Sequence, residues 1–228
     1  MWILMAVIAA AIGYLLGSIN SAIISVRLLK HEDVRQFGSG NAGLTNTMRC
    51  FGKGCGFLTL FGDLTKGVLA VFLSQFIAYH LIGETADLYF FGAMAGIFAI
   101  VGHVFPLYYH FKGGKGVLVG VSLFLVLDWR VFCILMGIFG IILLCSKIVS
   151  LSSIIATACC PLITFLMQYF WSGGQWTLPW ILIHVLQTII MATVIIASHH
   201  ENISRLRNGT ERKIGQKKAE PEDTADAE

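Results

Sequence analysis

Residues 2–17 read WILMAVIAAAIGYLLG and contain no charged side chain. This stretch decides the fold class, because the apolar segment continues to Val26 and about 20 such residues are enough to cross a bilayer. Its apolar side chains lack the 3.6-residue period of an amphipathic helix in a soluble protein. No basic flank precedes it and no small-residue cleavage site follows it, so we interpret it as a first span and not as a secretory signal.

Further apolar runs follow it, separated by short polar breaks. Of the 228 residues, 56% are hydrophobic and 13% are charged, whereas soluble domains average about 25% charged. We therefore predict an all-α integral membrane protein, a bundle of about seven transmembrane helices. The fourth and fifth runs are short for full spans, so either is expected to be tilted, kinked or extended. The predicted helices are 2–26, 54–82, 88–109, 116–127, 131–146, 151–170 and 178–198.

The basic residues indicate the orientation of this bundle. If successive helices cross in alternating directions, one face collects four segments, and these hold 15 of the 16 Lys and Arg residues. Only Arg130 falls on the other face. Because cytoplasmic loops collect Lys and Arg, we predict that the N-terminus is outside and the C-terminus cytoplasmic. The four segments are 27–66, 112–115, 147 and the tail after 198.

The chain is predicted to hold one membrane domain, residues 1–213, with its active-site loops on the cytoplasmic side. Residues 214–228 end in AEPEDTADAE and are expected to be a disordered polar tail, since they have little apolar surface to bury. The six cysteines show no CxxC or Cys/His ligand spacing, so we expect reduced packing residues, no metal site and no cofactor.

Residues 37–49, FGSGNAGLTNTMR, are rich in glycine and small polar side chains. Glycines let backbone N–H groups approach an anion, and Ser, Thr and Asn add donors. The stretch satisfies GxGxxG with Asp63 downstream, but a charged segment precedes it instead of a strand, which argues against a dinucleotide site. The alternative is a re-entrant segment whose small residues only allow close packing. The candidate anion-binding residues here are Gly38, Ser39, Gly40, Asn41, Gly43, Thr45, Asn46 and Arg49.

Residues 102–117, GHVFPLYYHFKGGKGV, end one predicted helix, turn on glycines and begin the next. A phosphate held there would meet helix N-terminal N–H groups together with a lysine. The pattern is not a Walker A loop, because Lys115 is followed by glycine and no hydroxyl is left for magnesium. The alternative is that Lys112 and Lys115 only face lipid headgroups. The candidates here are Gly113, Gly114, Lys115 and Gly116.

Two weaker stretches follow, KIVSLSS at 147–153 and HHENISRL at 199–206. Serines commonly cap helices or bond across membrane bundles, and the second stretch is also typical of a basic interfacial helix. A functional interpretation makes His199 and Asn202, three residues apart on one helical face, donors to a phosphate. Asp63 and Lys66, also three apart, are expected to pair. The candidates from these two stretches are Ser150, Ser153, His199 and Asn202.

The order of these motifs resembles the bacterial acyl-phosphate:glycerol-3-phosphate acyltransferase family, the PlsY type. The resemblance covers the chain to about Lys213. It implies seven membrane helices and transfer of an acyl group from acyl phosphate to the 1-hydroxyl of glycerol 3-phosphate. The products would be lysophosphatidic acid and phosphate, in the first step of phospholipid synthesis. The motifs are GSGNAGLTNTMR from Gly38, GDLTKG from Gly62, GHVFPLYYHFKGGKGV from Gly102, SLSSI from Ser150 and HHENISRLRNGTERK from His199.

The resemblance also implies roles for single residues. Ser39, Arg49, Lys115 and His199 are expected to be catalytic, with the other candidates binding substrate. The chain departs from the family where Ile19 follows Gly17-Ser18 in place of a frequent proline, and where Leu118-Val119 replaces a frequent Ala-Thr. Arginine is frequent in the family where His200 stands, so no role is carried onto that residue.

The same resemblance implies the partners and the location. The substrates would be acyl phosphate and glycerol 3-phosphate, in a multi-pass protein of the bacterial cytoplasmic (inner) membrane with its active site facing the cytoplasm. Membrane lipids and the enzyme that makes acyl phosphate are the expected partners; nucleic acid is not.

None of the seven histidines has aspartate five positions on, so the His-x4-Asp base of the soluble-type glycerolipid acyltransferases is absent. We therefore hypothesise substrate-assisted transfer without an acyl-enzyme, because an acyl phosphate is already activated. The alternative function is a membrane transporter for phosphorylated solutes. It is less favoured because we find no internal repeat and the polar motifs cluster at helix ends on one side.

Overall fold

The computed structural model describes residues 1–215, which are helical with connecting loops and contain no strand. Six segments are long and apolar enough to cross a membrane: residues 2–30, α3, α4, α6, α7 and α8, while α5 is a shorter apolar helix. The predicted all-helical membrane fold is confirmed. The helices are α1 (Trp2–Gly17), α2 (Ser21–Lys30), α3 (Leu44–Ile82), α4 (Leu88–Val104), α5 (Val117–Leu127), α6 (Trp129–Ser146), α7 (Val149–Trp171), α8 (Leu178–Ala197) and α9 (His200–Arg207), with short 3-10 turns η1 (Val34–Gln36) and η2 (Leu107–Tyr109).

The first apolar run is two helices and not the single helix predicted over 2–26. The break has a local cause, because the Asn20 side chain caps α2 by accepting a hydrogen bond from the Ile23 N–H at 3.0 Å. Asn20 also donates to the Ala42 carbonyl at 3.3 Å, which ties the break to the loop before α3. The interruption leaves the Ile19 carbonyl free to accept a hydrogen bond from Lys66 Nζ at 2.8 Å.

Helix α3 begins ten residues earlier than predicted, at Leu44 instead of Gly54. Its first turns therefore contain part of the glycine-rich motif that the sequence suggested was a loop. The helix is kinked at Gly52, where φ is 82°, a conformation that glycine adopts at little cost. The part of α3 after this break, residues 53–82, is about 45 Å long at 1.5 Å per residue, so it extends beyond a hydrocarbon core of about 30 Å.

Helix α5, the predicted fourth span, has 11 residues and a length of about 16 Å, which is about half of the hydrocarbon core. A single non-helical residue, Asp128, separates it from α6, and the Asp128 carboxylate caps α6 by accepting from the Arg130 N–H at 3.0 Å. Arg130 also donates to the Trp171 carbonyl at 2.9 Å, so this corner lies beside the end of α7. The fifth predicted span, α6, thereby gains two residues at its start.

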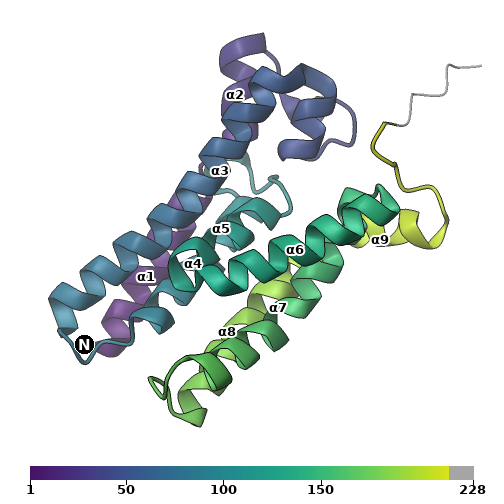
Figure 1. Ribbon diagram of the computed structural model, residues 1–228. Helices are drawn as coiled ribbons and strands as arrows, with labels where there is room; N and C mark the ends of the chain where they lie inside the picture. Colours follow the sequence, from purple (N-terminus) through teal and green to yellow (C-terminus); the bar gives the residue numbers. More distant parts are fainter. Residues whose placement is uncertain (216–228) are drawn as a thin grey trace, which may run out of the picture.

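The functional motifs gather at one end of the bundle, here called the motif end: residues 31–43, 105–116, 147–148 and 198–215. Figure 1 shows α2 and α9 at this end and the N-terminus at the other. Backbone hydrogen bonds join the motif-end loops, from Ala42 to Gly113 and from Ile214 to Lys147. At the opposite end, Trp2 stacks on Phe91 with ring centroids 5.0 Å apart.

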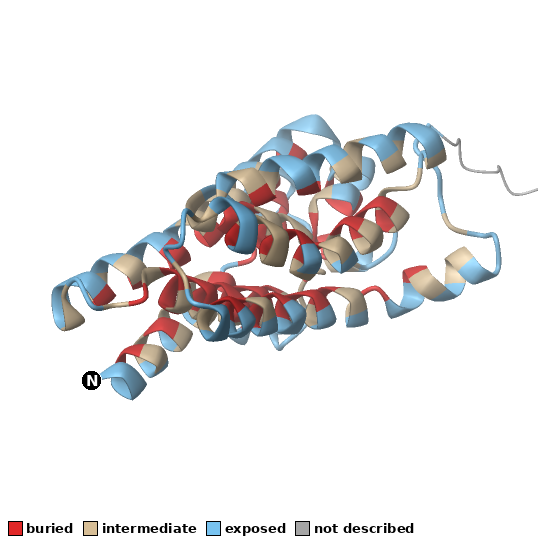
Figure 2. Ribbon diagram, turned by 60° about the horizontal axis from the view of Figure 1, so that its bottom comes forward, coloured by how far each residue is buried: buried red, intermediate tan, exposed pale blue. Residues whose placement is uncertain are grey.

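The bundle core follows the close pairing of α1 with α4. A Cβ added to Gly13 would lie 2.0 Å from the Ala95 carbonyl oxygen, and one added to Gly17 would lie 2.2 Å from that of Ala99. Small residues let membrane helices approach to backbone contact in this way. Buried residues run along the inward faces of the helices, while the outward faces are exposed (Figure 2). Outward-facing Phe57, Phe61 and Leu144 are the apolar side chains expected against lipid.

Candidate active site

A cavity of about 360 Å³ at the motif end brings together most of the residues singled out in the sequence. All four stretches contribute to its wall, and 13 of the 16 candidate residues line it. The three that do not are Gly40, Gly113 and Gly114. The candidates lining the cavity are Gly38, Ser39, Asn41, Gly43, Thr45, Asn46, Arg49, Lys115, Gly116, Ser150, Ser153, His199 and Asn202.

Asn46 holds the glycine-rich loop in shape from the first turn of α3. Its side-chain amide donates to the carbonyls of Val34 (3.3 Å) and Phe37 (2.9 Å), and its Oδ1 accepts from the Ser39 N–H at 3.0 Å. Gly38 has a positive φ of 65°, and a Cβ there would lie 2.4 Å from Asn46 Oδ1. Glycine is therefore required at position 38 by both backbone conformation and space.

The N-terminus of α3 and Arg49 give this wall a positive character. Gly43 caps α3 without a side-chain acceptor, so the first N–H groups of the helix remain available to an anion. Arg49, about one turn further on, lines the cavity and forms no ion pair within the described part of the chain. A cation without a counter-ion beside free helix N–H groups is well suited to bind a phosphate.

The GGKG loop contributes its lysine to the cavity and its first two glycines to packing. A Cβ on Gly113 would lie 2.0 Å from the His103 carbonyl oxygen, and one on Gly114 would lie 2.2 Å from His103 Nε2. The Gly114 N–H donates to that same carbonyl at 3.1 Å. These two glycines therefore lie against the end of α4 behind the wall, while Gly116, with φ of 81°, caps α5 and lines the cavity.

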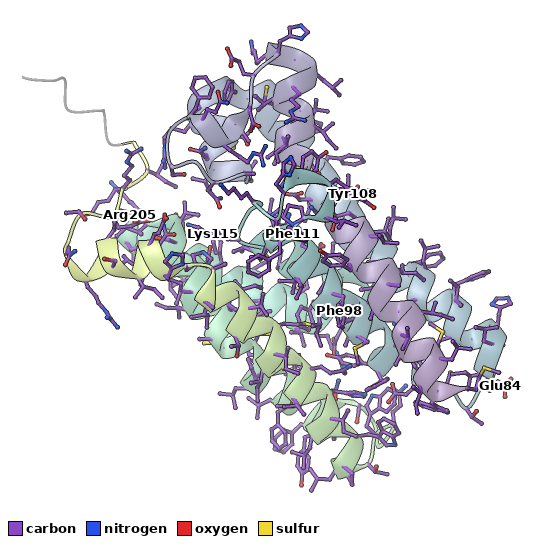
Figure 3. The ribbon with its side chains drawn as sticks, turned by 180° about the vertical axis from the view of Figure 1, so that it is seen from behind. Glu84, Phe98, Tyr108, Phe111, Lys115 and Arg205 are labelled. Carbon is purple, nitrogen blue, oxygen red and sulfur yellow. The ribbon has the colours of Figure 1, made fainter. Side chains whose placement is uncertain are left out.

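Lys115 reaches across the cavity to the last helix. Its Nζ donates to Asn202 Oδ1, and its carbonyl accepts from the Ser198 hydroxyl at 3.0 Å. Burial lowers the pKa of Lys115, and the nearby Arg205 guanidinium lowers it further. In Figure 3, Lys115 and Arg205 lie toward one end of the molecule and Glu84 toward the other.

Glu211 is a cavity residue that the sequence reasoning did not single out, although it lies within the HHENISRLRNGTERK stretch. Its carboxylate accepts from Ser150 Oγ (2.7 Å), Asn202 Nδ2 (2.6 Å) and Arg205 Nε (2.7 Å). Burial acts to raise its pKa, but these three hydrogen bonds outweigh burial and the pKa is lowered. Glu211 thus joins the start of α7 to α9 across the cavity.

His199 caps the start of α9 and is buried at the cavity wall. Its Nδ1 lies 2.7 Å from the Ile195 carbonyl oxygen. Because a carbonyl only accepts, Nδ1 carries the proton, which leaves Nε2 as the nitrogen without one in the neutral ring. Burial lowers the pKa of His199, and the Lys115 charge opposes protonation as well.

Further residues at the cavity wall come from inside the bundle. Asp63 and Lys66 pair as predicted, with Lys66 Nζ 3.0 Å from Asp63 Oδ1, and Asp63 and His103 both line the cavity. Phe139 of α6 also lines it, and its place within an apolar run gave no signal in the sequence. The cavity-lining residues not singled out beforehand are Leu44, His103, Val117, Leu118, Phe139, Val149, Arg205, Glu211, Arg212 and Ile214, with Asp63 expected only as an ion-pair partner.

A second, apolar cavity of about 120 Å³ lies between α5, α6, α7 and α8. Its wall is made of aliphatic, aromatic and small side chains, including Phe124, Met136 and Cys160. It shares four residues with the polar cavity: Val117, Leu118, Phe139 and Ser153. The two spaces are therefore neighbours, one suited to anions and the other to hydrocarbon.

Comparison with known proteins agrees with this arrangement. The family model described as glycerol-3-phosphate acyltransferase matches residues 7–209. Two curated relatives of that name, from Staphylococcus aureus (strain bovine RF122 / ET3-1) and Staphylococcus haemolyticus (strain JCSC1435), are 36% and 35% identical over 211 residues. In both cases the alignment covers 92% of this chain and 98% of the relative.

Two solved structures of PlsY (YgiH), an integral membrane glycerol 3-phosphate acyltransferase, share the fold. The glycerol 3-phosphate form superposes with a TM-score of 0.74 at 32% identity, covering 92% of this chain and 96% of that one. The lysophosphatidic acid form gives 0.71 at 30% identity, covering 92% and 95%. With the family model matching most of the chain, this protein belongs to the glycerol-3-phosphate acyltransferase family.

Proposed function

We propose that the protein transfers an acyl group from acyl phosphate to the 1-hydroxyl of glycerol 3-phosphate, forming lysophosphatidic acid and phosphate in the first step of phospholipid synthesis. The observation that carries this proposal is the pair of adjoining cavities, one lined by cations and N–H donors and one lined by hydrocarbon. An acyl phosphate has the same two parts, a phosphate head and an apolar chain. The glycerol 3-phosphate and lysophosphatidic acid forms of the solved relatives support the acceptor and the product.

Two phosphates need neutralising in this reaction, one on each substrate. Arg49 with the first turn of α3 offers one set of groups, and Lys115 offers a second. The acyl chain would lie in the apolar cavity, with its carbonyl near the shared residues Leu118 and Ser153.

The chemistry we propose is a single transfer assisted by the substrate. The acceptor oxygen bonds to the acyl carbon, the bond from that carbon to the phosphate oxygen breaks, and the leaving phosphate takes the hydroxyl proton. Lys115 and Arg49 stabilise the charge that develops. No cysteine side chain lines the polar cavity within residues 1–215, and the Ser150 and Ser153 hydroxyls donate to Glu211 and to the Val149 carbonyl.

We further propose that the protein resides in the bacterial cytoplasmic membrane with this site facing the cytoplasm, since 15 of the 16 Lys and Arg residues fall in the segments predicted to lie on that side. Residues 1–213 are proposed to act as one membrane domain. The enzyme that makes acyl phosphate remains an expected partner.

A donor comparison tests the activity. Purified protein is given glycerol 3-phosphate with palmitoyl phosphate, palmitoyl-CoA or palmitoyl acyl carrier protein, and lysophosphatidic acid is measured. We expect product only from palmitoyl phosphate, with one phosphate released per acyl transfer. Product from the thioester donors, or a trapped acyl-Ser or acyl-Cys species, would contradict the proposal. Uptake of glycerol 3-phosphate by proteoliposomes without any donor would instead favour the transporter.

A further inference from the structure

Three ionisable side chains meet inside the bundle beside the polar cavity: Asp63 and Lys66 of α3 and His103 of α4. They are 1%, 4% and 3% exposed. Lys66 Nζ lies 3.0 Å from Asp63 Oδ1 and 2.8 Å from His103 Nδ1. Buried charges are costly unless they are paired, so a cluster of this kind at a cavity wall calls for a function beyond packing.

Lys66 pairs with one oxygen of the Asp63 carboxylate, its Nζ lying 3.0 Å from Oδ1. It donates to the Ile19 carbonyl and to His103 Nδ1, both at 2.8 Å. Asp63 Oδ1 is buried against the Lys66 ammonium, and no residue within 1–215 donates a hydrogen bond to the other carboxylate oxygen, Oδ2. A buried acceptor without a donor is unfavourable. The Asp63 carboxylate, which lines the cavity, therefore has acceptor capacity to spare.

Among the charged groups around the cavity, the cations cannot accept a hydrogen bond from a hydroxyl. Arg49 and Lys115 are donors, and the second cavity-lining carboxylate, Glu211, already accepts from three side chains. Glycerol 3-phosphate carries two hydroxyl groups that need acceptors as well as a phosphate that needs donors. Asp63 is the cavity-lining carboxylate, among residues 1–215, that is left to accept from one of them.

The position of the apolar cavity decides which hydroxyl this is. The acyl carbon must lie near the residues that the two cavities share, such as Leu118 and Phe139 of α5 and α6, and the reacting 1-hydroxyl must point there. Asp63 lines the polar cavity but not the apolar one, so it is available to the hydroxyl that does not react. We propose that Asp63 accepts a hydrogen bond from the non-reacting 2-hydroxyl of glycerol 3-phosphate and determines the specificity for a diol acceptor. This inference rests on the proposed function.

The test compares two acceptors with palmitoyl phosphate as donor: glycerol 3-phosphate and 3-hydroxypropyl phosphate, which lacks the 2-hydroxyl. For the unmodified protein we expect kcat/KM to favour glycerol 3-phosphate by about tenfold or more, because a site built to bind a hydroxyl discriminates against an analogue without it. The double variant Asp63→Leu, Lys66→Met removes both buried charges together. We expect it to lower the preference to within about threefold.

Two further variants separate recognition from folding. Asp63→Asn retains an amide oxygen as acceptor and should keep most of the preference. Asp87→Asn changes the buried aspartate at the opposite end of the bundle, which accepts from His184 Nε2 at 2.9 Å, and should leave the ratio unchanged whatever it does to the yield. Calorimetric binding of the two acceptors gives the same ratio without turnover.

The outcomes are distinct. Equal kcat/KM for the two acceptors in the unmodified protein, or an unchanged ratio in the double variant, would overturn the role of Asp63 and leave the acyltransferase proposal intact. Failure of the unmodified protein to acylate glycerol 3-phosphate from palmitoyl phosphate would instead overturn the proposed function, and this inference with it. A purely structural role for Asp63 would lower activity on both acceptors equally.

Discussion

Lys115 is the cation most deeply involved in the cavity, because it is half-buried and reaches Asn202 on the far wall. Replacing it with alanine removes a charge positioned for the phosphate and the developing oxyanion. We expect Lys115→Ala to lower kcat/KM by about 10²–10³-fold, the range for loss of one preorganised donor, while the protein still folds. The measurement is phosphate release from palmitoyl phosphate in the presence of glycerol 3-phosphate.

Lys112 supplies the matched control, because it lies in the same loop but is exposed and does not line the cavity. Lys112→Ala should keep activity within about twofold, since exposed charges contribute little. Equal losses in the two variants would show that the loop acts only through its overall positive charge.

His199 gives the site a dependence on pH. Because burial holds its pKa below the usual 6.5, the ring is neutral at pH 7 and Nε2 has no proton to donate. A phosphate dianion at Nε2 would raise that pKa, so glycerol 3-phosphate should bind with uptake of up to about one proton. Calorimetry at pH 7 in buffers of different ionisation enthalpy measures this number, and His199→Asn should reduce it.

The lowered pKa of His199 also makes the free energy of unfolding depend on pH. Below about pH 6.5 the histidine of the unfolded protein takes up a proton before that of the folded protein does. The free energy of unfolding should therefore decrease as the pH is lowered from about 6.5 toward the lowered pKa. In the calorimetric binding experiment, proton uptake that is the same in His199→Asn as in the unmodified protein would show that another group takes up the proton.

The structure places at the cavity the candidate residues that a local pattern marked, such as Lys115 in its glycine-rich loop and Arg49 at the end of its motif. Sequence reasoning assigned Gly113 and Gly114 to the anion site, whereas the structure places them against His103. It did not find Glu211 or Phe139, because a carboxylate near the chain end and an aromatic in an apolar run have no local pattern that marks a site. Their place at the cavity depends on how α6, α7 and α9 come together.

At the scale of elements, the contact between α1 and α4 depends on glycine. Because a Cβ at position 13 would meet the backbone of Ala95 and not a flexible side chain, the helices must move apart to accept it. We expect Gly13→Ala to lower the free energy of unfolding by about 1–3 kcal/mol, as overpacking does. Denaturation in detergent, followed by circular dichroism, measures the change.

Gly137 of α6 allows the same substitution without a clash, since nothing lies within 4 Å of an added Cβ. Gly137→Ala should be neutral or stabilising by up to about 1 kcal/mol, because alanine favours the helix. If Gly13→Ala and Gly137→Ala had the same free energy of unfolding, the close packing of α1 on α4 would not be required for stability.

The two largest differences from the predicted element boundaries each have a reason beyond hydrophobicity. The first run breaks because Asn20 both caps α2 and bonds to the Ala42 carbonyl. Helix α3 starts early because Asn46, whose side chain binds the preceding loop, lies inside its first turn. In both cases a polar side chain is fixed by loop residues outside its own helix, which hydropathy does not report.

At the scale of the whole molecule, the charge distribution predicts which end faces the cytoplasm. In a variant without native cysteines, Glu84→Cys at the opposite end should react with an impermeant maleimide on intact cells. Lys112→Cys at the motif end should react only after the membrane is opened. Both positions are exposed, so accessibility within the protein is matched. The reverse labelling pattern would contradict the predicted orientation.

Hydropathy and charge along the chain were enough to predict a helical membrane protein with four polar motifs at one end. Apolar length and charge bias act through the bilayer, which treats every segment alike and needs no knowledge of neighbouring helices. Only the tertiary structure decided which motif residues share a cavity, where the apolar cavity joins it, and that Asp63, Lys66 and His103 meet beside it. Those contacts depend on side-chain packing and hydrogen bonds between helices that are far apart in the chain. No local sequence pattern specifies which of these helices meet.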